Sequence, residues 1–304
     1  MSLHRLDSVT LGVPDVEEAA RFYVDFGLTR TGSAFSTVDA GEQLRLVESP
    51  HRRLVSVRFA ADDLDDLRRA HGDLTRLGVA SSITGLRLTT ADPGTGVGVE
   101  VTVASRLVQP PVAAPAANGP GRHDRVNARA AGVLVEGRVR PRRLGHFVLG
   151  TTSFEASHDF FVEGLRFKVS DIIKDFGMFL RCSTDHHNVL IQRAPVPFLH
   201  HTSWQVEDVD AVGRGAVDML AEHPERHVWG LGRHYAGSNF FWYLKDPAGN
   251  FAEYHSDMDC IPEDALWTPE VLEGARGLYR WGPPPPPSFV DPEDLADLMI
   301  SGHS

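Results

Sequence analysis

Three residues in the second half of the chain have side chains that could bind one metal ion together: His146, His201 and Glu253. Each lies in a short segment of apolar and aromatic residues that predicts a β-strand. A strand that only packs against a core has no need of a carboxylate, so Glu253 must face water, pair with another group or bind a metal. Two histidines and one carboxylate are the ligand set expected for non-haem Fe(II) with open coordination positions, and they also suit Mn(II).

Histidine is abundant in this chain, which contains fifteen of them and has many in its second half. Cys182 and Cys260 are its only cysteines, too few for a disulfide framework, which favours a reducing cytoplasm. Clustered histidines in such a chain make a metal site worth testing. For any one histidine, the alternative interpretation is a surface or loop position.

The chain contains an internal repeat that relates its two halves. The segment from Leu6 aligns with the segment from Leu144 at an offset of 138 residues, and a second pair of segments begins at Leu54 and His200. Each segment predicts a strand followed by an amphipathic helix, and each half then continues to an Asp-Pro turn and a further strand. We therefore predict four strand–helix–strands units, arranged as two similar halves.

The two halves differ at the candidate ligands. The aligned pairs are His146 with Ser8, His201 with Ser56 and, one residue out of step, Glu253 with Glu100. The first half therefore keeps the framework but lacks both histidines. Because side chains alternate along a strand, His200 and His201 are expected on opposite faces, and the equivalence with His146 selects His201 as the ligand.

One segment, GLGRHYAGSNFFWYLKDPAGNFAEYHSD at residues 230–257, combines several distinctive residues. It contains His234, then a Trp-Tyr pair that ends at Tyr243, then an Asp-Pro turn with a glycine, and then Glu253. This combination resembles the signature of the two-domain type I extradiol ring-cleaving dioxygenases of the vicinal oxygen chelate superfamily. The resemblance covers most of the chain, roughly residues 3–258, and it is specific because several residue types and spacings must agree together.

The resemblance implies a role for each of these residues. His146, His201 and Glu253 would be the ligands of Fe(II), with Mn(II) as the other metal that fits. His234 and Tyr243 would be hydrogen-bonding partners of the substrate and of oxygen.

A further segment, DHHNVLIQ, resembles the active-site histidine segment of the same family. Its second histidine, here His187, would take a proton from the substrate and later return it, which the pKa range of histidine allows. The interval from His187 to His201 is one residue shorter than in the biphenyl-type members, so His186 is the alternative for this role.

The fold implied by the resemblance is α+β, with two similar domains that each consist of two paired βαβββ modules and form an open barrel-like cup. We expect residues 1–108 to form an N-terminal domain of this kind without metal ligands. Residues 109–141, rich in proline, alanine and glycine, are expected to be a linker region. Residues 142–260 would be the catalytic metal-binding domain, and residues 261–304 a C-terminal tail that covers the mouth of the site.

The function implied is an extradiol dioxygenase, which uses O₂ and Fe(II) to cleave the ring of a catechol next to its vicinal diol and incorporates both oxygen atoms. The expected partners are an aromatic diol, O₂ and further copies of the chain in a homo-oligomer. The alternatives on the same fold are a metal-dependent isomerase or transferase and a ligand-sequestering protein. A charged ring substituent would need a cation, and the candidates Arg181, Arg193 and Arg233 cannot be placed from spacing.

Composition argues against several other classes of function. The formal net charge is −11, and no lysine- or arginine-rich face stands out, so a nucleic-acid partner is not expected. The first twenty residues lack the apolar run of a signal peptide, and no window is long and apolar enough to predict a membrane-spanning helix.

Overall fold

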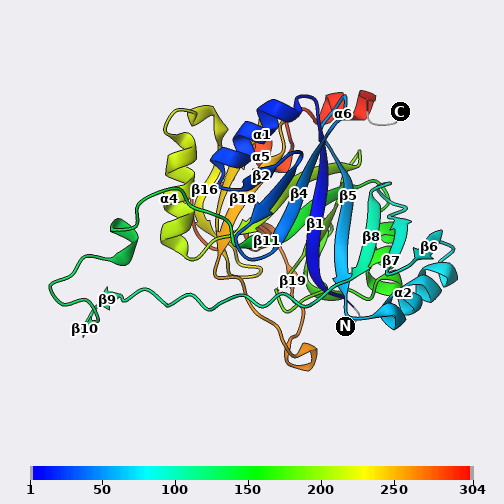
Figure 1. The fold of residues 1–304 in the computed structure, drawn as a ribbon, viewed down its shortest axis with the longest axis horizontal. Coiled ribbons are helices and arrows are strands. Elements are labelled where there is room, and N and C mark those ends of the chain that lie inside the picture. The colour runs from blue at the N-terminus through cyan, green and yellow to red at the C-terminus, as the bar shows by residue number, and fades with distance from the viewer. Residues whose placement is uncertain (1–2, 302–304) are drawn as a thin grey trace.

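The computed structural model describes residues 3–301, which form two large mixed β-sheets with few helices (Figure 1). Each sheet is built from two βαβββ modules, and the first strands of the two modules pair at its centre. The first sheet has eight strands in the order β2-β3-β4-β1-β5-β8-β7-β6. The second has nine, in the order β16-β17-β18-β15-β11-β14-β13-β12-β19. The predicted α+β class and its four repeated modules are confirmed, and both sheets are open at their edges.

The elements of the first half follow the repeat closely. Its first module comprises β1 (Leu3–Val13), α1 (Val16–Asp25), β2 (Thr29–Thr31), β3 (Ala34–Thr37) and β4 (Gly41–Glu48). Its second module comprises β5 (Arg53–Ala61), α2 (Leu64–Arg76), β6 (Ser81–Thr84), β7 (Arg87–Ala91) and β8 (Gly98–Val103).

The second half repeats this arrangement with one irregular helix. Its first module comprises β11 (Arg143–Thr151), α3 (Phe154–Asp159) with the π-helical turn η2 (Phe160–Gly164), β12 (Lys168–Ile173), β13 (Gly177–Arg181) and β14 (Val189–Arg193). Its second module comprises β15 (Phe198–Gln205), α4 (Val209–Leu220), η3 (Pro224–Arg226), β16 (His227–Arg233), β17 (Phe240–Lys245) and β18 (Phe251–Ser256).

The segments outside the modules behave differently from one another. The connection between the halves carries β9 (Asn118–Gly119), β10 (Arg122–His123) and η1 (Ala131–Val133), and it extends away from both sheets (Figure 1). The C-terminal segment carries η4 (Asp264–Leu266), β19 (Val271–Leu272), η5 (Gly274–Gly277), α5 (Pro287–Val290) and α6 (Leu295–Ser301). This segment is part of the second half, because β19 pairs in parallel with β12.

The strand register supports the alignment of the two halves. Ser203 pairs with Glu253 across β15 and β18, as Arg58 pairs with Glu100 across β5 and β8. Glu100 therefore occupies the position equivalent to Glu253. There its carboxylate lies on a partly exposed surface, 3.7 Å from the guanidinium of Arg87.

The two halves share one hydrophobic core, which fixes the second sheet against the first. The rings of Phe26, at the end of α1, and Tyr254, on β18, stack with centroids 3.9 Å apart. The Tyr254 hydroxyl also donates a hydrogen bond to the carbonyl of Phe26 at 2.7 Å. Tyr254 neighbours Glu253 in sequence, so the first half supports the strand that carries the carboxylate from its opposite face.

No helix within residues 3–301 is long and apolar enough to cross a membrane. The division of the chain at residues 108, 141 and 260 stays a prediction.

Candidate metal centre

The three predicted ligands come from three adjacent strands at the centre of the second sheet. His146 on β11 pairs with Ser203 on β15, and Ser203 pairs with Glu253 on β18. His201 stands two residues before Ser203, and therefore on the same face of β15. This register brings the three side chains together on the inner face of the sheet.

The ligand atoms of these residues all lie within 4.8 Å of one another, and all three residues are buried. His146 Nε2 lies 3.1 Å from Glu253 Oε2, and His201 Nε2 lies 3.6 Å from the same oxygen. The two Nε2 atoms are 3.3 Å apart. No second cluster of this kind is present among residues 3–301.

The Glu253 carboxylate shows that this cluster fits a cation. Its side chain is fully buried, and its Oε1 accepts a hydrogen bond from Asn239 Nδ2 at 3.2 Å. Its Oε2, which faces the two imidazoles, has no hydrogen-bond donor. A buried carboxylate oxygen without a donor is costly, whereas a divalent ion between it and two neutral imidazoles would compensate it.

The protonation states favoured by the site are those of metal ligands. Burial lowers the pKa of His201 well below 6.5, so its imidazole is neutral at pH 7. Burial alone would raise the pKa of Glu253, but the neighbouring His146 and His234 outweigh it and hold this pKa well below its usual value. A neutral imidazole and an ionised carboxylate are the forms that coordinate a metal.

A β-bulge brings His200 to the same site. Val148 pairs with His201 and Leu149 with Leu199, so His200 is the extra residue of β15. An extra residue interrupts the alternation of side chains, and both histidines line the same cavity. The expectation that His200 points to the opposite face is therefore wrong.

His200 orients the predicted ligand beside it. Its Nε2 contacts the carbonyl of Phe289, which can only accept, so this nitrogen carries the proton. In the neutral imidazole its Nδ1 is then the acceptor, and His201 Nδ1–H donates to it at 2.8 Å. The lone pair of His201 is thereby placed on Nε2, the atom that faces Glu253.

A second pair of adjacent histidines is arranged in the same way. His186 Nε2–H donates to the Asp171 carboxylate at 3.0 Å, and His187 Nδ1–H donates to His186 Nδ1 at 3.0 Å. The bare Nε2 of His187 is then available to accept a proton. His187 lines the cavity, with its ring centroid 4.2 Å from that of His146, whereas His186 does not line it.

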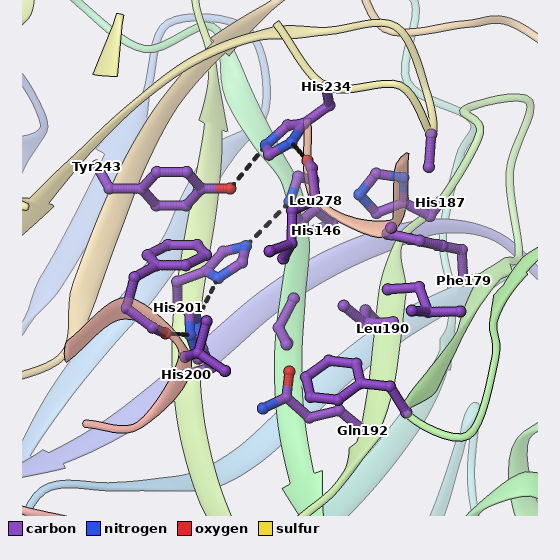
Figure 2. A pocket seen from close by; sticks show the side chains of 17 residues that line it. His146, Phe179, His187, Leu190, Gln192, His200, His201, His234, Tyr243 and Leu278 are labelled. Carbon is purple, nitrogen blue, oxygen red and sulfur yellow. Dashed lines mark hydrogen bonds between the residues drawn. The ribbon is translucent and has the colours of Figure 1, made fainter. Parts of the chain in front are cut away.

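His234 and Tyr243 lie next to each other, close to His146 and His201 (Figure 2). His234 Nδ1–H donates to the carbonyl of Leu278, and the Tyr243 hydroxyl donates to His234 Nε2 at 2.9 Å. Burial, reinforced by the charge of Glu253, raises the pKa of Tyr243 well above 10, so its hydroxyl stays protonated. Both residues line the cavity.

These residues share one cavity, which opens to solvent. Its apolar walls come from the β11–β14 region, the loop between β16 and β17, and the C-terminal segment. They include Val148, Ile173, Phe176, Phe179, Leu190, Ala236, Leu278, Phe289 and Val290. The three arginines considered as substrate ligands are paired elsewhere: Arg181 with Asp264, Arg193 with Glu155 and Arg233 with Asp257.

Comparisons with known proteins agree with this site. Residues 143–254 match the Glyoxalase/Bleomycin resistance protein/Dioxygenase superfamily. Metapyrocatechase 2 of Cupriavidus necator is 33% identical in an alignment of 304 positions that covers 95% of this chain and 92% of that protein. The chain belongs to the extradiol ring-cleaving dioxygenases of the vicinal oxygen chelate superfamily.

Two further relatives, each aligned with this chain over half of its own length, are named for different metals. The iron-dependent extradiol dioxygenase of Rhodococcus jostii is 27% identical and covers 46% of this dioxygenase. The manganese-dependent 2,3-dihydroxybiphenyl 1,2-dioxygenase of Geobacillus genomosp. 3 is 28% identical and covers 48%. The ligand set of the present dioxygenase suits both metals.

Solved structures share the fold over nearly the whole chain. The Mn(II)-bound glyoxalase from Novosphingobium aromaticivorans has a TM-score of 0.72 and 25% identity, and it covers 93% of each chain. A variant of homoprotocatechuate 2,3-dioxygenase from B. fuscum has a TM-score of 0.73 and 20% identity, covering 95% of this chain and 81% of that one.

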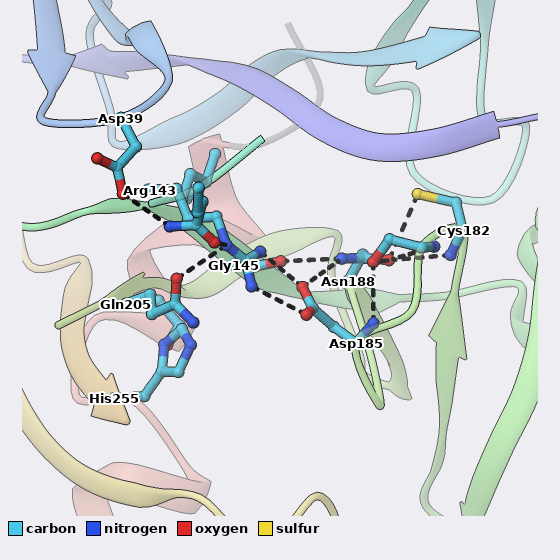
Figure 3. A network of polar contacts seen from close by, with 12 residues as sticks. Asp39, Arg143, Gly145, Cys182, Asp185, Asn188, Gln205 and His255 are labelled. Carbon is cyan, nitrogen blue, oxygen red and sulfur yellow. Dashed lines mark hydrogen bonds and ion pairs between the residues drawn. The ribbon is translucent and has the colours of Figure 1, made fainter. Parts of the chain in front are cut away.

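A partly buried polar network holds the two segments that carry His146 and His187 in the dioxygenase (Figure 3). Arg143 makes a bidentate ion pair with Asp185, at 2.6 and 2.9 Å. The Asn188 amide donates to the carbonyl of Gly145 at 3.2 Å. The network thus ties the strand at His146 to the loop before His187.

The C-terminal segment of the dioxygenase closes the site with its backbone as well as its side chains. The carbonyls of Leu278 and Phe289 accept hydrogen bonds from His234 and His200, and both residues also line the cavity. Arg52 of the first half pairs with Asp294 and so helps to anchor this segment. These carbonyls could not be identified from the sequence, because every residue has one, and His200 was placed on the opposite face because the bulge in β15 leaves no signal in the sequence.

We expect the substitution His200→Gln to lower the affinity of the dioxygenase for Fe(II) and Mn(II) by about 10–100-fold, the usual effect of losing a group that orients a ligand. The reason is that His201 loses the acceptor that places its lone pair on Nε2. Competition with a chromophoric chelator would measure the affinity. The control is His223→Gln at an exposed turn, and an equal loss in both variants would contradict the role of His200.

We also expect the metal-free dioxygenase to lose stability as the pH falls below 6.5. Burial lowers the pKa of His200 to about 4 and that of His255 to about 3. Below the unfolded value near 6.5, the unfolded chain binds protons that the folded chain excludes, so the free energy of unfolding decreases toward acid. Each histidine contributes a slope of up to about 1.4 kcal/mol per pH unit.

Chemical denaturation between pH 7 and 4.5, with a chelator present, tests this expectation. The substitution His255→Gln removes one titrating group, so its stability should change less steeply with pH than that of the unaltered chain. Parallel curves for the two proteins would show that His255 does not exclude its proton in the folded state.

Proposed function

We propose that this dioxygenase cleaves the ring of a catechol next to its vicinal diol, with Fe(II) or Mn(II) held by His146, His201 and Glu253. The observation that carries the proposal is the Glu253 oxygen without a donor, which faces the imidazoles of His146 and His201. Those two imidazoles line a mostly apolar cavity. That cavity gives an aromatic ring a place beside the open positions of the metal.

The metal, when bound, would supply coordination positions at which the diol and O₂ are brought together, and so overcome the slow reaction of triplet oxygen with a closed-shell catechol. His187 would take a proton from a diol hydroxyl on its bare Nε2. Burial lowers the pKa of His187 well below 6.5, so this nitrogen is free at pH 7. Once protonated, the same nitrogen can return the proton to an oxygen atom during ring opening.

His234 and Tyr243 would stabilise the charge that develops on oxygen. Their hydrogen bond to each other keeps both polar atoms beside the predicted ligands before the substrate arrives. Tyr243 can turn its hydroxyl from His234 toward a substrate oxygen, because a hydroxyl rotates freely about its bond. The apolar walls exclude water, which strengthens these interactions.

We further propose the domain division drawn from the sequence, with the first half as a structural copy that supports the catalytic half.

We also propose that the protein is a homo-oligomer in the cytoplasm. The two free cysteines, Cys182 buried and Cys260 exposed, support the cytoplasmic location, because disulfides are rare there. Light scattering during gel filtration would measure the number of chains, and a single-chain mass would contradict the oligomer.

The test of the reaction begins with protein purified without air and loaded with Fe(II) or Mn(II). Catechol, 3-methylcatechol and 2,3-dihydroxybiphenyl are added, O₂ is admitted, and absorbance and oxygen uptake are recorded. A yellow product with one O₂ consumed per diol is expected. One bound metal per chain without oxygen uptake would favour an isomerase or transferase, and the absence of bound metal would favour a ligand-sequestering protein.

A further inference from the structure

The cavity contains one polar side chain that the proposed mechanism does not use. Gln192, on β14, is only 5% exposed and lines the cavity together with His146 and His201. Its amide has no hydrogen-bond partner within residues 3–301. Its amide nitrogen and oxygen are not sealed from solvent, so two donors and an acceptor face the cavity. The amide is therefore available to a molecule that enters the cavity.

The strand register places Gln192 far from the metal end. On the paired strands β11 and β14, Gln192 lies opposite Gly150, and Leu190 lies opposite Val148. His146 is four residues before Gly150, which corresponds to about 13 Å along the strand. Figure 2 likewise shows Gln192 at the end of the cavity opposite His234. A ring held by its diol at the ligands would therefore present a substituent, rather than the diol, to Gln192.

The space between the ring position and Gln192 is apolar. Val148, Phe179 and Leu190 line it, and among residues 3–301 no lysine or arginine lines any part of the cavity. A carboxylate on the substrate would be buried there without a counter-ion, which is strongly unfavourable. A neutral substituent with an apolar stem would instead remove these surfaces from water.

We infer that the substrate is a catechol whose ring carries a neutral substituent with an apolar stem and a terminal hydrogen-bonding group, such as a hydroxyl or carbonyl. Gln192 binds this terminal group and so acts as a specificity-determining residue. The inference rests on the proposed function, because it requires the diol to bind at the metal end of the same cavity.

The experiment compares catechols that carry a propyl group with catechols of the same shape that carry a 3-hydroxypropyl group, each at ring position 3 and at ring position 4. The measured quantity is the ratio of kcat/KM for the hydroxyl compound to kcat/KM for the alkyl compound. For the unaltered enzyme we expect a ratio of about tenfold in at least one ring series, the effect of one neutral hydrogen bond to an otherwise unpaired group.

The substitutions Gln192→Leu and Gln192→Met remove the amide at nearly constant volume, and they should bring this ratio to one or below. Leu190→Met, at the next inward-facing position of β14, is the matched control, and it should change kcat/KM for both compounds alike and keep the ratio. A catechol with a propionate group should be a poor substrate of every variant.

Two outcomes are distinguishable. If the Gln192 variants cleave catechols with the ratio of the unaltered enzyme, or if the unaltered enzyme has no preference, the inference about Gln192 is overturned and the proposed function stands. If the metal-loaded enzyme cleaves no catechol at all, the proposed function itself fails.

Discussion

The substitution Glu253→Gln is expected to abolish stable metal binding and, with it, ring cleavage. Glutamine preserves the shape of the side chain but removes the negative charge that faces His146 and His201. We expect the affinity for Fe(II) and Mn(II) to fall by more than about 100-fold, beyond the range typical of residues that only orient a ligand. Metal content after dialysis and chelator competition would measure the loss, with oxygen uptake as the second readout.

The internal repeat offers a matched control for this experiment. Glu100→Gln makes the same change at the equivalent position of the first sheet, where the carboxylate is partly exposed near Arg87. This variant should keep its metal and its activity. Retention of one tightly bound metal per chain by the Glu253 variant would show that the carboxylate is not a ligand.

The second large effect is expected for His187→Asn, which should lower kcat by about 10²–10⁴-fold while metal affinity changes little. Asparagine can still donate a hydrogen bond toward His186, but it has no atom in place of Nε2 to carry a proton. The measurements are steady-state kinetics under saturating O₂, metal content, and the pH dependence of kcat. In the plot of kcat against pH, the decrease that reports protonation of the base should disappear together with the loss of rate.

His186→Asn separates the proton-accepting residue from the residue that positions it. His186 contacts Asp171 and His187 but does not line the cavity, so we expect a smaller loss of kcat and a pH profile of unchanged shape. If His186→Asn proved more damaging than His187→Asn, the roles assigned to the two histidines would be reversed.

Much of the fold and of the candidate site follows from the sequence, because both depend on patterns that repeat. The two halves have the same order of strands and helices, so their alignment predicts four modules without any knowledge of packing. The same alignment identifies His146 and His201 by their contrast with Ser8 and Ser56. Glu253 is identifiable because a carboxylate within an aromatic strand needs a cation or water, and here it is fully buried.

The rest was decided by contacts between residues far apart in the chain. Strand alternation predicts opposite directions for His200 and His201, but a bulge opposite β11 brings both to one cavity, and pairing irregularities of this kind are not visible in residue order. The proposal of His187 rather than His186 as the proton acceptor likewise rests on Asp171, which lies on another strand and accepts a hydrogen bond from His186.

The sequence by itself thus determined the module order and the metal-binding residue types, because these are local and repeated. Only the tertiary structure showed that carbonyls of the C-terminal segment hold His200 and His234, and that Gln192 faces the cavity without a partner. The physical reason is that a hydrogen bond depends on where two groups meet in space. In the sequence, these carbonyls and this amide cannot be told apart from the many backbone carbonyls and side-chain amides that bind water.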